Sequence, residues 1–433
     1  MTNRPEPETP GRESGATSAT GGPRRRTAFL SYLALAGPGL IAANAGNDAG
    51  GIATYASAGA QFGYRTLFLM LVVTVALVVV QEMSARLGAY SGKGLAALIR
   101  EQFSIRIAAF AVLCLLVANI GLVVSEFAGI GAGLELFGLS RYYTVPIAAI
   151  GIWGLVMFGS YRYAERVFLV LGLIFFTYPI AAILGHPNWH QVVSNTFIPH
   201  FVASQDFVLL GVALVGTTIT PYMQLYGAAG VVDRGIGPGE YRYERIDAVG
   251  GAIFANVISF FIIVATAAAI GGHGPLTSAK EAAQALRPVA GSAAEALFGL
   301  GLLGASALAG AVVPLSTSYA ISEALGVERS VSRRFSEAPL FLGLFTAQIV
   351  FGAAVALTPV NLIRLLIGTQ VLQGLITPVI LIFILIMANR ESVLGAARNG
   401  RVFRKVAFLA VAGVGSFSML LVVLMVLSWL GIT

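Results

Sequence analysis

Long apolar stretches separated by short polar connections make up most of this chain. After residue 27, eleven stretches are long and apolar enough to cross a bilayer as helices. They lie near residues 28–58, 65–89, 107–136, 143–160, 165–185, 206–230, 247–271, 292–325, 337–357, 362–388 and 406–430. With 57% hydrophobic and 11% charged residues, the composition excludes an ordinary soluble domain. The pattern therefore predicts an all-α polytopic membrane protein in contact with the lipid bilayer.

Basic residues fall on every second connection. If the N-terminus is cytoplasmic, the cytoplasmic segments hold 22 of the 27 Lys and Arg residues. The external connections hold Arg65, Arg141, Lys280 and Arg287. This bias predicts a protein of the cell membrane with a cytoplasmic N-terminus and, after an odd number of spans, an extracellular C-terminus. The net charge of +7 follows from the same bias, so no nucleic acid partner is expected.

The first 27 residues have a different composition from the rest of the chain. They are rich in Pro, Gly, Ser, Thr and Arg and lack apolar periodicity, which is typical of a disordered tail. The apolar stretch that follows is long and has no small-residue cleavage site, so we expect a retained first helix.

A carboxylate and two glycines interrupt the first apolar stretch. Asp48, Gly50 and Gly51 lie where the helix would cross the bilayer. A charged Asp in that position costs roughly 2.5–3.5 kcal/mol on insertion scales, so it is rarely present without a function. Glycines allow the helix to unwind and turn its carbonyl groups toward a cavity. This combination predicts a cation site in a broken helix.

The sixth stretch contains a second interruption. Residues 216–222 read GTTITPY, in which Pro221 removes a backbone hydrogen bond and the threonines offer hydroxyl groups. A proline kink without a function is the alternative explanation. Because the first and sixth spans are both interrupted, we expect two five-helix halves, residues 28–185 and 206–388, with an additional helix at 406–430. Such inverted repeats place their site near the bilayer midplane.

Several motifs resemble the Nramp family in both order and spacing. They are GPG at 37–39, DAGGIAT at 48–54, QFGY at 61–64, SARLG at 84–88 and NR at 389–390. The resemblance covers nearly the whole chain after residue 28. It implies a leucine-transporter-like fold, with a 5+5 inverted repeat and an eleventh helix, that transports divalent transition metals.

The chain departs from the family at two ligand motifs. The family's first-helix motif is Asp-Pro-Gly-Asn, whereas here Asp48 is followed by Ala49, Gly50 and Gly51. Its sixth-helix motif is Met-Pro-His, whereas here Thr220 precedes Pro221 and Tyr222. Without the soft thioether, oxygen ligands remain, and these suit Mg²⁺, Ca²⁺ and Mn²⁺. Loss of the asparagine at Gly51 is expected to leave room for a partly hydrated Mg²⁺.

Proton coupling is also placed in doubt. The family carries an Asp three residues before a Glu in the third span; here Glu126 is kept but Val123 replaces the Asp. Tyr222 replaces the family's histidine, and a phenol does not relay protons at neutral pH. The departures resemble the Nramp-related magnesium transporters. We therefore expect uncoupled inward transport of Mg²⁺, and also of Mn²⁺, with a proton-coupled Mn²⁺/Fe²⁺ importer as the alternative.

The predicted site combines residues from several spans. The expected metal-binding residues are Asp48, Gly51, Thr217, Thr220 and Gln370, and further candidates for a second shell or vestibule are Asn44, Asn47, Tyr222 and Glu126. For Gln370, an interhelical hydrogen bond is the alternative role. For Asn44 and Asn47, the alternative is capping of an unwound turn.

Other classes of function fit the sequence less well. At membrane depth there is no nucleophile–base pair, histidine cluster or phosphate-binding loop, so neither an enzyme nor a bound cofactor is expected. The single cysteine, Cys114, excludes an intrachain disulfide. A channel with a static pore is the other alternative, and slow saturable uptake would distinguish a carrier from it. A monomer is favoured.

Overall fold

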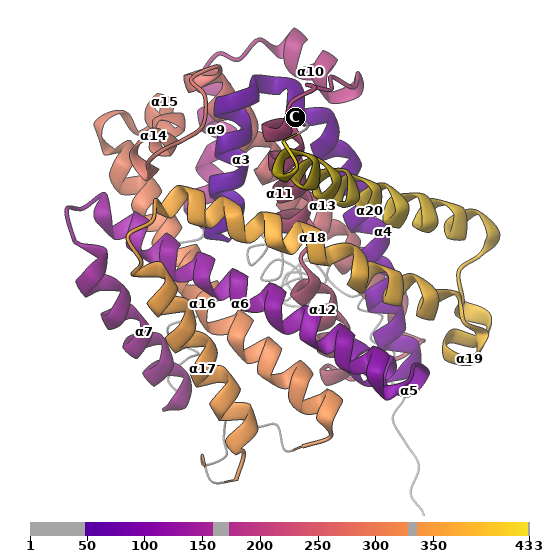
Figure 1. Ribbon diagram of the computed structural model, residues 1–433. Coiled ribbons are helices and arrows are strands. Elements are labelled where there is room, and N and C mark those ends of the chain that lie inside the picture. Colours follow the sequence, from indigo (N-terminus) through magenta and orange to yellow (C-terminus); the bar gives the residue numbers. More distant parts are fainter. Residues whose placement is uncertain (1–47, 159–172, 328–334, 336, 432–433) are drawn as a thin grey trace, which may run out of the picture. The chain divides into compact units, whose positions relative to one another are not determined.

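Helices form all the regular structure of the described residues. The computed structural model describes residues 48–158, 173–327, 335 and 337–431, which lie within the unit Gly39–Thr433 (Figure 1). Eight helical segments of the described residues are long and apolar enough to cross a membrane. The expected tail at 1–27, Asn44, Asn47, the first half of the first span and part of the fifth lie outside the described residues.

The helices follow the apolar stretches of the sequence. The first part of the chain contains α3 (Ala49–Phe62), α4 (Leu67–Ser91), α5 (Leu95–Gln102), α6 (Ile105–Glu135), α7 (Arg141–Met157), α9 (Thr177–Leu184) and α10 (Trp189–Phe197). The middle part contains α11 (Gln205–Thr218), α12 (Pro221–Asp233), α13 (Tyr241–Ile270), α14 (Ala279–Ala283) and α15 (Arg287–Ala290). The last part contains α16 (Ala294–Leu325), α17 (Pro339–Ala356), α18 (Leu362–Asn389), α19 (Glu391–Leu394) and α20 (Arg401–Trp429).

Helix α3 is enclosed by other helices. Residues 49–60 are all buried, and α3 packs against α13, α18, α11 and α6. Five of these twelve residues are Ala and three are Gly, which allow helix backbones to approach closely. At Gly59, a Cβ atom would lie 2.5 Å from the carbonyl oxygen of Ile263 in α13. Small side chains therefore place the start of α3 in the interior of the helical assembly.

A buried ion pair joins the ends of several helices. The predicted topology places these ends on the cytoplasmic side. The sequence suggests a local pair between Glu82 and Arg86, and the structure confirms it at 3.1 Å. Tyr241 of α13 donates a hydrogen bond of 2.5 Å to Glu82. Arg86 donates to the carbonyl oxygen of Ala397 at 3.1 Å and lies over the ring of Phe403. The pair therefore links α4 to α13 and to the start of α20.

Charges from other helices lie at both ends of α5. The carboxylate of Glu323 lies against Gly94, the N-cap of α5, where a Cβ atom would approach it to 2.7 Å. Arg390 donates to the carbonyl oxygen of Gln102 at 2.9 Å, at the opposite end. An anion at the N-terminus and a cation at the C-terminus both stabilise the helix dipole. We therefore assign Glu323, near the C-terminal end of α16, a structural contact with α5.

Candidate metal-binding site

Asp48 lies at the N-terminus of α3. It is the N-cap residue, and its carboxylate accepts a hydrogen bond of 2.5 Å from the Gly51 amide. Only 2% of the residue is exposed. The N-terminus of a helix stabilises an anion, because its free amide groups and the helix dipole both point toward the negative charge. Helix α3, the second half of the predicted first span, therefore begins at a buried carboxylate.

The sixth span consists of two helices, as its sequence predicts. Helix α11 ends at Thr218, and Thr220 has an extended backbone (φ −69°, ψ 136°) before α12 begins at Pro221. Proline suits the first position of a helix because it has no amide proton to leave unpaired. Thr377 of α18 donates a hydrogen bond of 3.1 Å to the carbonyl oxygen of Ile219. That bond satisfies one backbone acceptor at the break.

The space beside Gly51 differs from the expectation. A Cβ atom on Gly51 would lie 2.6 Å from Thr217 Oγ1 and 3.0 Å from Asp48 Oδ1. The sequence predicts that Gly51 leaves room for a hydrated ion. That prediction is wrong for the space that a Cβ atom of residue 51 would take, because Thr217 Oγ1 lies there. The hydroxyl of Thr217 faces the Asp48 carboxylate. The glycine instead brings Thr217 and Asp48 together.

Gln370 reaches the start of α3 from α18. It is fully buried, and its Nε2 donates a long hydrogen bond of 3.5 Å to Ser125 Oγ of α6. A Cβ atom on Gly50 would collide with the Gln370 amide and would lie 2.6 Å from Ser125 Oγ. The interhelical hydrogen bond is therefore present, but it engages only the amide nitrogen. Gln370 Oε1 remains available for a ligand.

Several buried oxygen atoms near the two breaks lack a hydrogen-bond partner among the described residues. They are Thr217 Oγ1, Thr220 Oγ1, Gln370 Oε1 and both carboxylate oxygens of Glu126. Buried polar atoms are nearly always paired, so such a set requires an explanation. All of these atoms can accept, and a cation satisfies several acceptors at once. The chemistry of the donor set therefore fits a divalent metal ion.

Glu126 lies close to Asp48 but in a different setting. Its carboxylate faces the Ala49 amide and the Ser306 hydroxyl, although neither lies within hydrogen-bonding geometry. The two carboxylates are near enough for their charges to repel. A divalent cation between helices α3 and α6 would relieve that repulsion. Tyr222 is also buried, in the first turn of α12.

Sequence reasoning missed the residues that allow α6 to approach α3. A Cβ atom on Gly129 would collide with the side chains of Ala49 and Ser306. Ser125 lies one turn earlier, against Gly50 and Gln370. The signal was present in the sequence, since small residues recur every four positions at Gly121, Ser125, Gly129 and Gly133. This spacing is typical of closely packed membrane helices.

The donors of the candidate site differ from those of a thiolate or imidazole centre. Within the ranges that the structure describes, no three His, Cys, Asp or Glu side chains form a group that could hold a metal. The four histidines lie in or beside the connections that the sequence predicts to be external, at 186, 190, 200 and 273. The site near Asp48 thus combines acidic side chains with neutral oxygens.

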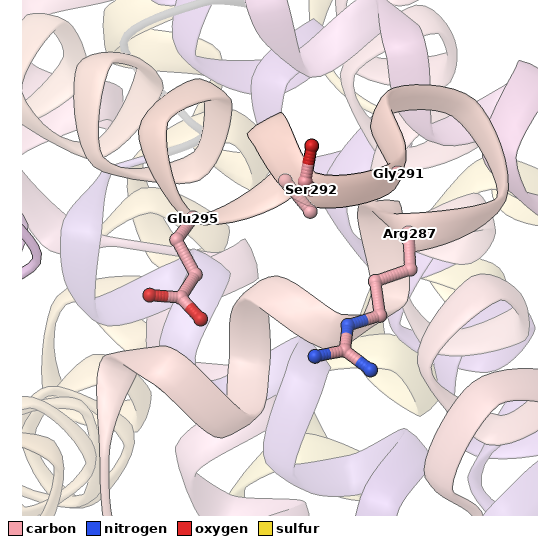
Figure 2. Close-up of a pocket in the computed structure, with 5 residues that line it drawn as sticks. Arg287, Gly291, Ser292 and Glu295 are labelled. Carbon is pink, nitrogen blue, oxygen red and sulfur yellow. The ribbon is translucent and has the colours of Figure 1, made fainter.

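A separate surface cavity lies in the expected external connection. It measures about 340 Å³ and is lined by Arg287, Gly291, Ser292, Ala294 and Glu295 (Figure 2). Glu295 pairs with Lys280 at 3.3 Å. Along α16, Glu295 is about 16 Å from Ser306, which lies beside Glu126. The cavity is therefore distinct from the group of unpaired oxygens.

Comparisons with known proteins identify both the fold and a family. Residues 39–424 match the family described as natural resistance-associated macrophage protein-like (Nramp). A divalent metal cation transporter, MntH, of Verminephrobacter eiseniae is 29% identical over 422 residues, which cover 92% of this chain and 91% of that protein. The fold is similar to that of the Eremococcus coleocola manganese transporter, with a TM-score of 0.73, 19% identity and coverage of 92% and 88%. MhsT, solved with L-phenylalanine, gives a TM-score of 0.59 at 14% identity, with coverage of 89% and 97%. The fold is therefore that of an all-helical, leucine-transporter-like membrane protein.

Substitution of Gly51 tests the geometry of the site. The Cβ atom of Gly51→Ala would displace Thr217 or Asp48, so we expect Mn²⁺ to bind about tenfold more weakly, the effect of losing roughly 1.4 kcal/mol. Gly227→Ala is the matched control, because a Cβ atom on this exposed glycine of α12 meets open space. Calorimetric titration of the purified variants measures the change. Equal affinity in Gly51→Ala and the parent protein would contradict the arrangement.

Proposed function

Because the chain belongs to the Nramp family of divalent metal transporters, we propose that it carries Mg²⁺ as well as Mn²⁺ into the cell at Asp48, without moving protons. Family membership makes it a multi-pass membrane transporter of divalent metal ions and not an enzyme. The observation that carries the proposal is the buried hydroxyl of Thr220, which has no hydrogen-bond partner among the described residues. The motif of the resembling family has a methionine there.

The ligand chemistry supports a hard cation. Thr217, Thr220 and Gln370 offer neutral oxygens around the carboxylate of Asp48. Oxygen donors suit Mg²⁺ and Mn²⁺, whereas a thioether favours softer metals such as Cd²⁺. Mg²⁺ usually keeps several waters and takes one or two carboxylates from a protein. A site with Asp48 and a few neutral oxygens meets that requirement.

The proposal that no protons move with the metal rests on residues 123 and 222. Val123 is fully buried and faces α17, where a Cβ atom on Gly352 would lie 2.7 Å from Val123 Cγ1. Tyr222 follows Pro221, where the motif of the resembling family has a histidine. A proton that leaves Glu126 would find no acidic or imidazole side chain at either position. A membrane potential alone would drive a divalent cation inward by about 4.6 kcal/mol per 100 mV.

The transport cycle that we propose is alternating access between two five-helix repeats, residues 28–185 and 206–388. The broken first and sixth spans would hold the ion at the midplane between the repeats. The distribution of basic residues supports a cytoplasmic N-terminus and an extracellular C-terminus.

A second candidate is a proton-coupled importer of Mn²⁺ or Fe²⁺. The relatives favour it, because their names specify divalent metal cations and manganese rather than magnesium. Glu126 also favours it. Its carboxylate lies beside Asp48, has no hydrogen-bond partner in the described ranges, and could exchange a proton with the site. Both candidates transport Mn²⁺. They differ in whether Mg²⁺ is accepted and whether protons move with the metal.

Removal of the Asp48 charge tests the site that both candidates share. In Asp48→Asn and Asp48→Ala we expect uptake of Mn²⁺ and Mg²⁺ into proteoliposomes to fall to the level of empty liposomes, because the remaining ligands near the ion would be neutral apart from Glu126. Asp206→Asn, an exposed residue in the first turn of α11, is the control and should transport normally. Transport at the parental rate in either Asp48 variant would refute the assignment.

Proton movement distinguishes the two candidates. We expect Mn²⁺ influx to follow the membrane potential and to leave the internal pH unchanged, because Val123 and Tyr222 interrupt the route from Glu126. Fluorescent indicators for metal and pH, recorded together in proteoliposomes, measure both fluxes. Acidification that depends on the metal, and that is missing from Asp48→Asn vesicles, would establish the proton-coupled alternative.

A further inference from the structure

We propose that Tyr55 supports the metal site through Thr217: when the Thr217 oxygen binds the cation, the Tyr55 hydroxyl accepts the proton of Thr217. The inference rests on the function proposed for the Asp48 site, in which the Thr217 hydroxyl is a ligand. Tyr55 is a positioning residue, and the proposal assigns it no contact with the ion.

Tyr55 lies beside the ligands at the start of α3. It follows Asp48 by seven residues, about two turns, so the two residues share a face of the helix. Tyr55 is 1% exposed. A Cβ atom on Gly51 would lie 2.6 Å from Thr217 Oγ1 and 3.4 Å from Cε2 of the Tyr55 ring. The same atom would lie 3.0 Å from Asp48 Oδ1. The carboxylate, the threonine hydroxyl and the tyrosine ring therefore surround one small volume.

The Tyr55 hydroxyl joins three helices. It lies 3.0 Å from Thr218 Oγ1, and either of these oxygens can be the donor. It also faces the hydroxyls of Thr217 in α11 and Ser259 in α13. These three residues are buried, with at most 4% of any of them exposed. A phenol of α3 therefore lies among hydroxyl groups of α11 and α13.

The hydrogen bonds leave the Tyr55 oxygen able to accept. Ser259 Oγ donates to the carbonyl oxygen of Ala255 at 3.1 Å, so its lone pairs are open to another donor. Tyr55 can donate to Ser259 and still accept, because a phenol has one proton and acceptor capacity besides. Thr217 Oγ1 has no hydrogen-bond partner among the described residues. Its proton is therefore not committed to a carbonyl group of its own helix.

A hydroxyl that binds a cation needs an acceptor for its proton. The oxygen binds the ion through a lone pair, so the proton must point elsewhere. Before the ion binds, the Asp48 carboxylate, which Thr217 faces, can accept that proton. A carboxylate that continues to do so gives up a lone pair that the cation needs. Tyr55 offers an acceptor that does not compete with the ion, as groups beyond the ligands do at other metal sites.

A double-mutant cycle tests the proposal. We expect Tyr55→Phe to raise the Kd for Mn²⁺ about fivefold, as loss of one modest hydrogen bond does. In a Thr217→Val background the same change should have less than a twofold effect, because valine has no proton to place. In a Thr217→Ser background the effect should again be about fivefold. Tyr64→Phe is the matched control, because this half-buried tyrosine lies in η1 (Gly63–Thr66), beyond the far end of α3, and the variant should bind Mn²⁺ normally.

A second variant reaches the same hydrogen bonds without changing Tyr55. Thr218→Val combined with Ser259→Ala removes the other partners of the Tyr55 hydroxyl. The phenol proton would then turn to the Thr217 oxygen and occupy the lone pair that binds the cation. We expect this variant also to raise the Kd for Mn²⁺ several-fold.

Calorimetry on purified protein measures these affinities without relying on transport. An equal loss of affinity in the parent and Thr217→Val backgrounds would show that Tyr55 acts through packing, and it would overturn the proposal alone. An unchanged Kd in Tyr55→Phe would also overturn it, and the second variant decides in the same way if Tyr55→Phe does not fold. Failure of the parent protein to bind Mn²⁺ would instead refute the proposed function on which the inference rests.

Discussion

The structure depends on one buried carboxylate. Asp48 is 2% exposed in a chain whose other long segments are apolar, and a charge without a counter-ion is costly in such surroundings. The amide of Gly51 and the N-terminus of α3 offset part of that cost. The hydroxyl of Thr217 faces the carboxylate, yet the side-chain oxygens of Thr220 and Gln370 have no hydrogen-bond partner in the part of the chain that the structure describes. A cation that binds among them would satisfy the charge and the acceptors together, which links the stability of this region to transport.

Backbone geometry brings these groups together. The break between α11 and α12 turns Thr220 out of a regular helix, and the carbonyl of Ile219 is satisfied by Thr377. Small residues then allow α3, α6 and α18 to approach closely, since side chains at Gly50 or Gly129 would collide with their neighbours. Helix packing inside a bilayer relies on such close contact, because apolar side chains gain little from leaving lipid. The same residues that pack the helices therefore shape the site.

Much of the fold could be predicted from the sequence, because spanning helices require long apolar stretches and broken helices require proline, glycine or a charge. The break before Pro221 was predicted in this way, and the i,i+4 spacing of Glu82 and Arg86 predicted their ion pair. The contact among Gly50, Ser125 and Gln370 could not be predicted, because these residues are far apart in the chain. Hydropathy does not indicate which helices pack against each other. For the same reason, the space beside Gly51 was taken as open when Thr217 fills it.

Competition between metals at equilibrium tests whether the oxygen ligands around Asp48 select hard divalent cations. Purified parent protein and Thr220→Met should be titrated with Mg²⁺, Mn²⁺ and Cd²⁺ under the same conditions. We expect the parent to bind Mg²⁺ and Mn²⁺ with similar affinity, and Thr220→Met to shift the preference toward Cd²⁺ by about tenfold, because it introduces a soft thioether. A parent protein that binds Cd²⁺ far more tightly than Mg²⁺, with a preference unchanged by Thr220→Met, would contradict the account.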